Sequence, residues 1–166
     1  VPGEWHVMGV VQSAGLSLRW FRDNFCAAEE AEAQKRGIGS YRVMDEYAAK
    51  VPVGSNRLIY LPYLMGERTP HLDPFARGVF FGLSAVHTRH DMLRAVMEGV
   101  TFALRDSLTI FNEANVTVDS MMACGGGASS PLWRQMLADV FNCTVLTAES
   151  NEGGALGTAL LAAAGT

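Results

Sequence analysis

The chain has 166 residues, 49% of them hydrophobic and 18% charged, and a formal net charge of −4 at pH 7. This length is ample for one hydrophobic core, the negative charge disfavours a nucleic-acid partner, and no apolar run approaches the ~18 residues of a membrane helix. The three cysteines lie far apart, and the four histidines lack metal-ligand spacing. We therefore expect a reduced, cytoplasmic protein with no metal site and no disulfide framework.

The first predicted elements are a strand over residues 5–11 and a helix capped by Ser13. The helix has apolar residues at helical spacing and should bury Leu16, Trp20, Phe21 and Phe25. Gly15 lies in its first turn. The sequence supports two explanations for Gly15 equally: the glycine allows tight packing, or it leaves room for a phosphate at a helix N-terminus.

The middle of the chain predicts short elements joined by polar loops: a surface helix over residues 27–36 ended by Gly37 and Gly39, a short helix over 43–50, a strand over 58–64 broken by Pro62, and a loop over 66–78. That loop holds the densest polar cluster of the chain. Asp73 should accept hydrogen bonds from the local backbone after a turn, while the role of His71 stays open.

A strand over residues 79–83 precedes a long helix with a capping box formed by Thr88 and Asp91. Its apolar residues keep helical spacing over roughly six turns, and Glu98 and Gly99 interrupt them. Glu98 could be a catalytic acid, but a glutamate within a helix is usually solvated or paired. We expect this ordinary role for it.

The most informative stretch is a glycine turn between a strand that ends at Cys124 and a helix that begins at Pro131. We define the glycine turn as Gly125, Gly126, Gly127, Ala128, Ser129 and Ser130. Ser130 is a good N-cap, and proline suits the first helical position. Glycines let a ligand approach the backbone, and a helix N-terminus favours an anion. A branched residue at Gly127 would fill that space and resist unusual φ angles.

A competing interpretation is a dinucleotide-binding turn. Gly125, Gly127 and Ser130 stand at the positions of its fingerprint, and Glu149 follows the next apolar run about 20 residues on. A short strand at residues 145–146 and a helix over 155–164 complete the chain. Strands and helices alternate, so the predicted class is α/β.

Residues 125–139 (GGGASSPLWRQMLAD) resemble the nucleotide-binding segment of the FGGY carbohydrate kinases, and especially of members that act on xylulose. The segments at 63–71 (YLMGERTPH) and 76–83 (ARGVFFGL) are similar to the same family, as are residues 98–100 and 154–157. Together these motifs cover most of the chain in order. Pro131 replaces an asparagine that touches the nucleotide in glycerol kinases, which argues against glycerol as the substrate.

The resemblance implies an actin-like ATPase (ribonuclease H-like) domain, with a mixed sheet flanked by helices and incomplete at its N-terminal edge. Residues 1–166 would form a single domain, most of the C-terminal nucleotide-binding half of a two-domain kinase. Gly15, Arg19 and the glycine turn would contact ATP or ADP, with Mg²⁺ bound through the nucleotide. Arg19 stands where glycerol kinases have a glutamine.

In this family the general base and the sugar site would lie in an N-terminal domain outside this chain. No catalytic residue is therefore expected within it, and the chain alone should be inactive. An open sheet edge and an apolar cleft wall would favour self-association, and a homodimer remains open. A non-catalytic nucleotide-binding module is the non-enzymatic alternative.

Overall fold

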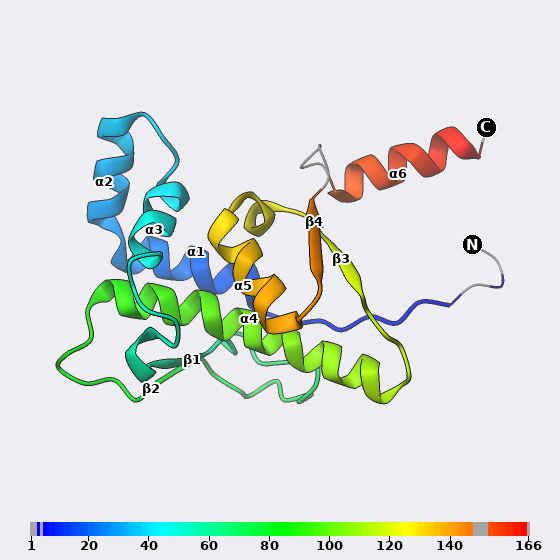
Figure 1. The fold of residues 1–166 in the computed structure, drawn as a ribbon, viewed down its shortest axis with the longest axis horizontal. Helices are drawn as coiled ribbons and strands as arrows, with labels where there is room; N and C mark the ends of the chain where they lie inside the picture. Colours follow the sequence, from blue (N-terminus) through cyan, green and yellow to red (C-terminus); the bar gives the residue numbers. More distant parts are fainter. Residues whose placement is uncertain (1–2, 4, 148–152, 166) are drawn as a thin grey trace. The chain divides into compact units, whose positions relative to one another are not determined.

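The computed structural model describes residues 3, 5–147 and 153–165 (Figure 1). The chain divides into two compact units, Val1–Thr117 and Val118–Thr166, and each is described here by itself. Both contain helices and strands, so the predicted α/β class is confirmed. Among the described residues, no helix combines the length and the apolar character that crossing a membrane requires.

The first unit contains four α-helices, a short 3₁₀ turn and two strands among its described residues: α1 (Ala14–Phe25), α2 (Ala27–Arg36), α3 (Ser40–Ala48), η1 (Ser55–Arg57), β1 (Ile59–Leu61), β2 (Val79–Phe81) and α4 (Arg89–Glu113). As predicted, a glycine ends α2: Gly37 has a φ of +64°, the left-handed conformation typical of a helix C-terminus.

The core of this unit lies where α4 packs on β1 and α1. β1 and β2 pair antiparallel, with Tyr60 opposite Phe80. The ring centroids of these two residues are 4.7 Å apart, and Phe80 also lies 6.5 Å from Phe21 of α1. Residues 93–100 of α4 are all buried. This aromatic and aliphatic contact holds the short two-stranded sheet against the long helix.

The capping box of α4 is confirmed, since the Thr88 side chain accepts from the N–H of Asp91 and the Asp91 carboxylate accepts from the N–H of Thr88. The predicted long helix is confirmed, since α4 continues through Glu98 and Gly99, which interrupt its apolar pattern but not the helix. Glu98 forms an ion pair at helical i,i+4 spacing with Arg94. Gly99 lies against the backbone of β1, where a larger residue would not fit.

The predicted strand over residues 5–11 is wrong, because this segment has no regular structure. Its backbone pairs with the polar loop at one point: the Val10 N–H donates to Thr69 Oγ1 at 3.1 Å, and the Thr69 N–H donates to the Val10 carbonyl at 3.0 Å. A strand needs a partner along its length, and among the described residues this segment has one only at Val10. Its first described residue, Trp5, is 97% exposed and does not pack against the unit.

The buried face of α1 differs from the expected one. Ser17, Leu18 and Phe21 are buried, whereas Phe25 is exposed. Ser17 is buried because its hydroxyl donates to the Ser13 carbonyl at 2.7 Å and accepts from the Tyr60 hydroxyl at 3.2 Å. Paired in this way, a small polar residue takes a core position that the hydrophobic pattern had given to larger side chains.

The second unit is a strand–helix–strand arrangement followed by a helix: β3 (Ser120–Ala123), η2 (Gly126–Ser129), α5 (Pro131–Phe141), β4 (Thr144–Thr147) and α6 (Gly153–Ala164). β3 and β4 pair in parallel, from Ser120 opposite Thr144 to Ala123 opposite Thr147. Parallel neighbours need a crossover, which α5 supplies. Glu149, the expected ribose-binding acid of the competing interpretation, lies outside the described residues.

Candidate functional site

The glycine turn connects the end of β3 to the start of α5, as the sequence predicts. Gly125 has φ +79° and ψ −171°, a conformation that is essentially restricted to glycine. η2 follows at once. The Ser130 side chain then caps α5 by accepting from the N–H of Trp133 at 3.0 Å, with Pro131 at the first helical position. The unusual backbone angle therefore lies at Gly125 and not at Gly127.

Some backbone groups of the glycine turn form hydrogen bonds within the turn, and others do not. The carbonyl of Gly125 accepts from the N–H of Ala128 at 3.1 Å, and the carbonyl of Gly127 accepts from the N–H of Ser130 at 3.2 Å. The N–H groups of Gly126 and Gly127 form no hydrogen bond with any described residue. The turn thus presents two donors while the carbonyls of Gly125 and Gly127 are used internally, which suits an anionic or acceptor-rich ligand.

The surface of the turn is open at its first two glycines. A Cβ atom added to Gly125 or Gly126 would meet nothing within 4 Å, and one on Gly127 would lie 3.4 Å from the Trp133 ring. All three glycines are exposed, whereas Ala128 is buried beneath them. The backbone of the three glycines is therefore accessible to a ligand, while the buried Ala128 packs within the second unit.

Sequence reasoning missed one side chain at this turn. Arg134, on α5, donates from Nη1 to the carbonyl of Ala128 at 2.6 Å. Its backbone N–H also donates to the Ser130 carbonyl at 3.0 Å. A position four residues after an N-cap faces back toward the preceding turn, and this spacing was the signal that could have identified it.

The other two predicted nucleotide contacts, Gly15 and Arg19, belong to the first unit and lie on α1. Gly15 is exposed in the first turn of α1, and a Cβ there would meet nothing within 4 Å. Among the described residues, packing therefore gives no reason for a glycine at this position. Arg19 is exposed one turn further on. Ser13 is the N-cap residue, but its hydroxyl accepts from the N–H of Met65 at 3.3 Å instead of capping α1.

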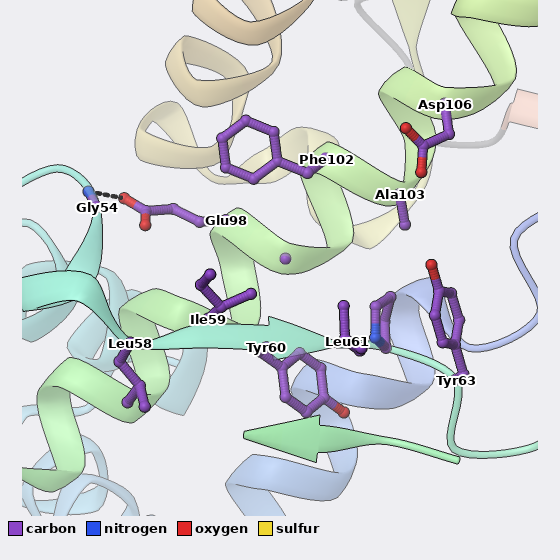
Figure 2. Close-up of a pocket in the computed structure, with 12 residues that line it drawn as sticks. Gly54, Leu58, Ile59, Tyr60, Leu61, Tyr63, Glu98, Phe102, Ala103 and Asp106 are labelled. Carbon is purple, nitrogen blue, oxygen red and sulfur yellow. Dashed lines mark hydrogen bonds between the residues drawn. The ribbon is translucent and has the colours of Figure 1, made fainter. Parts of the chain in front are cut away.

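The first unit also contains a mainly apolar cavity of about 260 Å³ between β1 and α4 (Figure 2). Ile59 and Leu61 line it from β1, and Phe102 and Ala103 line it from α4. Tyr63 lies at one end, where burial, with the negative charges of Asp106 and Glu67, raises the pKa of its hydroxyl.

Glu98 borders this cavity, but its carboxylate is fully engaged. Arg94 Nε and the N–H of Gly54 donate to Oε1 at 2.6 and 3.1 Å, and the hydroxyl of Ser55 donates to Oε2 at 2.9 Å. Both oxygens hold structure together, and the expected paired role is confirmed. Asp73 is likewise local, since its Oδ1 accepts from the N–H groups of Phe75 and Ala76.

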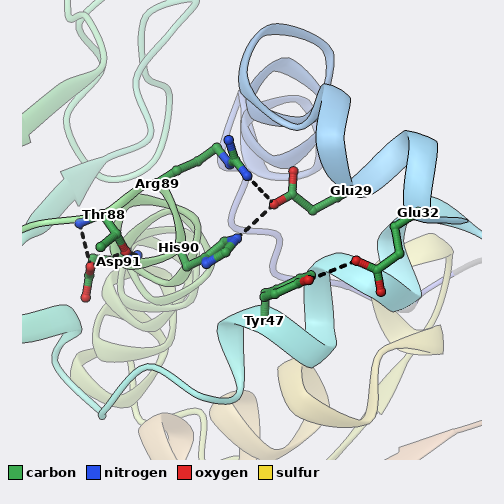
Figure 3. A network of polar contacts seen from close by, with 7 residues as sticks. All are labelled: Glu29, Glu32, Tyr47, Thr88, Arg89, His90 and Asp91. Carbon is green, nitrogen blue, oxygen red and sulfur yellow. Dashed lines mark hydrogen bonds and ion pairs between the residues drawn. The ribbon is translucent and has the colours of Figure 1, made fainter.

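A second polar network joins α2, α3 and the start of α4 (Figure 3). Glu29 is 2% exposed, and its Oε1 lies 2.8 Å from both Arg89 Nη2 and His90 Nε2. Burial alone would raise the pKa of Glu29, but hydrogen bonds from His90, from backbone and from Arg89, together with the charge of Arg89, lower that pKa below its ordinary value. The ring of Tyr47 stacks on that of His90, with the ring centroids 4.3 Å apart, and the Tyr47 hydroxyl donates to a carboxylate oxygen of Glu32.

Neither network forms a metal site. Within the part of the chain that the structure describes, no three His, Cys, Asp or Glu side chains gather where they could hold a metal ion. The three cysteines are unpaired, and burial raises the pKa of the Cys26 thiol to about 12, which makes it unreactive. The glycine turn is therefore the strongest candidate site.

Comparison with known proteins identifies the family to which the chain belongs. Residues 1–166 match the C-terminal domain of the FGGY family of carbohydrate kinases. A xylulose kinase of Bacillus subtilis is 42% identical over 162 residues, which are 98% of this chain and 30% of that protein. A gluconokinase of the same species is 40% identical over 95% of the chain and 31% of its own length. The chain thus spans about a third of the length of these relatives.

Solved structures give the same assignment. A ligand-bound xylulose kinase of Lactobacillus acidophilus superposes with a TM-score of 0.74 and 34% identity, over 92% of this chain and 29% of that one. A Plasmodium falciparum glycerol kinase solved with ADP has the same fold, with a TM-score of 0.75 and 20% identity over 92% of this chain and 28% of its own. With the actin-like ATPase fold of these sugar kinases and the match over residues 1–166, the chain belongs to the FGGY family of carbohydrate kinases.

Proposed function

We propose that this chain supplies the nucleotide-binding part of a kinase that transfers the γ-phosphoryl group of ATP to a hydroxyl of D-xylulose, giving D-xylulose 5-phosphate. The observation that carries the proposal is the glycine turn, in which the N–H groups of Gly126 and Gly127 bond to no described residue while the carbonyls of Gly125 and Gly127 are paired. Free donors at the start of α5 suit the oxygens of a nucleotide. The family match does not favour the alternative dinucleotide-binding oxidoreductase domain.

Phosphoryl transfer depends on positioning and charge neutralisation more than on a protein nucleophile. The residues of this chain would contribute the positioning half, by holding the nucleotide on the glycine turn. Mg²⁺ would arrive bound to the phosphates and offset their charge, which fits a turn that offers N–H donors and no carboxylate. The general base and most sugar contacts would come from the rest of the kinase.

The sugar is the least constrained part of the proposal. Xylulose kinases and gluconokinases of similar identity both align with the chain, so gluconate is the second candidate. A coupled assay of ADP release would compare D-xylulose, gluconate and glycerol as acceptors, using the whole protein that contains this chain. Turnover with D-xylulose well above that with gluconate is expected, and the reverse order would reassign the substrate.

Nucleotide binding can be tested on the 166-residue chain alone by calorimetry with ATP, ADP and NAD. We expect ATP and ADP to bind, NAD to bind much more weakly, and the chain alone to show no sugar-dependent turnover. Preference for NAD would restore the oxidoreductase interpretation. Failure to bind any of the three would remove the nucleotide-binding role, and with it the non-catalytic nucleotide-binding module.

Gly15 allows a separate test in the first unit. Because a Cβ there meets open space, Gly15→Ala should leave the melting temperature unchanged or slightly raised. A weaker affinity for ADP in this folded variant would support the nucleotide contact, while unchanged affinity would remove Gly15 from the proposed site. Arg19→Ala, on the same exposed helix face, should be compared with it.

A further inference from the structure

We propose that Arg134 is a positioning residue that turns the glycine turn into a surface of hydrogen-bond donors selective for the phosphate groups of a nucleotide. This inference rests on the proposed nucleotide-binding function. It concerns a side chain on α5 that lies within the sequence motif but to which the motif assigns no role, and it follows from the hydrogen bonds of the second unit.

Arg134 is held by one hydrogen bond from its backbone and one from its side chain. Its backbone N–H donates to the Ser130 carbonyl at 3.0 Å as part of the first turn of α5, and its guanidinium Nη1 donates to the Ala128 carbonyl at 2.6 Å. A charged donor makes a stronger hydrogen bond than a neutral one. The side chain therefore spans back across the N-terminus of the helix and clamps the end of η2.

The side chain of Arg134 pairs one more carbonyl of the turn. The carbonyls of Gly125 and Gly127 are already used by N–H groups within the turn. The Ala128 carbonyl is the acceptor that would stay available if Arg134 were removed, and Ala128 is only 7% exposed. An unpaired carbonyl beside the free N–H groups of Gly126 and Gly127 would repel phosphate oxygens or reorient to find another donor.

The charge of Arg134 acts in the same direction. Its guanidinium forms no ion pair with any carboxylate among the described residues, and its contact is with a neutral carbonyl. A positive charge with no carboxylate partner in the described part of the chain adds, at the start of α5, to the field of the helix N-terminus, which already favours an anion. Both effects should act on phosphates and leave an uncharged nucleoside almost unaffected.

The test compares dissociation constants for ADP and adenosine in wild type, Arg134→Met and Arg134→Lys, measured by calorimetry on the 166-residue chain below its melting temperature. Arg134→Met should weaken ADP binding at least tenfold and adenosine binding less than threefold. Arg134→Lys should recover part of the ADP affinity, since an ammonium group can still donate to the Ala128 carbonyl. Gln135→Met, the adjacent exposed position on α5, is the matched control and should change neither constant.

Each outcome decides between distinct conclusions. If the wild-type chain binds no ADP, the proposed function itself fails. If it binds ADP and Arg134→Met weakens ADP and adenosine by the same factor, or weakens neither, Arg134 has at most a structural role and the inference is overturned. Should Arg134→Met not fold, Arg134→Gln, which removes the positive charge, decides: an adenosine-to-ADP ratio of dissociation constants equal to that of wild type would contradict the phosphate-selective role.

Discussion

A Cβ atom on Gly99 would lie 2.1 Å from the carbonyl oxygen of Tyr60, so α4 packs directly on the backbone of β1. Real Cβ atoms do not approach a carbonyl oxygen this closely, and the obstacle is backbone, which cannot rotate away. We predict that Gly99→Ala destabilises the first unit by about 3 kcal/mol, although alanine favours a helix by about 1 kcal/mol over glycine. Urea unfolding followed by circular dichroism would measure this.

The control for this prediction is Gly157→Ala in α6, where an added Cβ meets nothing within 4 Å. With no obstacle, only the helical preference for alanine acts, and stability should be unchanged or rise by up to about 1 kcal/mol. Equal effects of the two substitutions would show that close packing of α4 on β1 is not what requires glycine at position 99.

The left-handed segment before β1 gives a second prediction. Arg57 has a φ of +72° and follows Ser55 and Asn56, which also have positive φ. This conformation costs a residue with a Cβ about 1–2 kcal/mol, more than the entropy that a glycine loses on folding. Arg57→Gly should therefore stabilise the chain by about 0.5–1 kcal/mol, measured as a rise in melting temperature.

Arg57→Ala separates the backbone from the side chain in this experiment. It removes the guanidinium but keeps the Cβ, so it should bring no stabilisation. A gain in Arg57→Ala equal to that in Arg57→Gly would mean that the arginine side chain, and not the backbone conformation, limits stability at this position.

Local signals in the sequence predicted much of this fold, and long-range contacts account for what they missed. The capping box at Thr88 and the cap at Ser130 were predictable because each depends on residues within one helical turn. The need for a glycine at position 99 of α4 was not, because its cause is the backbone of Tyr60, which lies on another element. In the candidate site, the glycine turn was evident from composition, but the angle at Gly125 was not.

Glu98 gives a third prediction, about a buried charge. Its partner Arg94 is 6% exposed, so removing the carboxylate would leave a buried guanidinium unpaired and also release the N–H of Gly54 and the hydroxyl of Ser55. Glu98→Ala should cost about 3–5 kcal/mol. The double variant Arg94→Met/Glu98→Leu should recover most of this loss, since no charge then remains buried; a double variant as unstable as Glu98→Ala would contradict that cause.

The network around Glu29 predicts a dependence of stability on pH. The pKa of Glu29 is lower in the folded protein than its ordinary value of 4.5, so the unfolded chain binds a proton more readily than the folded one. The stabilisation is complete above pH 4.5 and is lost as the pH falls through the folded pKa. In Glu29→Gln, denaturant midpoints between pH 6 and pH 3 should fall less steeply than in wild type.

Glu30→Gln is the comparison for this titration, because Glu30 is next to Glu29 on α2 but makes only a longer contact of 3.5 Å with Arg22. Its pH profile should follow that of wild type. If Glu29→Gln and wild type lose stability with the same slope, the carboxylate of Glu29 does not contribute to the acid sensitivity of the fold.

The last prediction concerns which glycine the proposed nucleotide site needs. The sequence drew attention to Gly127, but Gly125 has the angles, φ +79° and ψ −171°, that residues with a Cβ avoid. Gly125→Ala should cost about 1–3 kcal/mol of stability and should weaken ADP binding, because relaxing this angle redirects the N–H groups of Gly126 and Gly127. Gly127→Ala should be mild, since its Cβ would touch the Trp133 ring at an ordinary 3.4 Å. Melting temperatures and ADP affinities of both variants test this order. A larger loss in Gly127→Ala would mean that the space above the turn, and not its backbone angle, determines how the nucleotide is held.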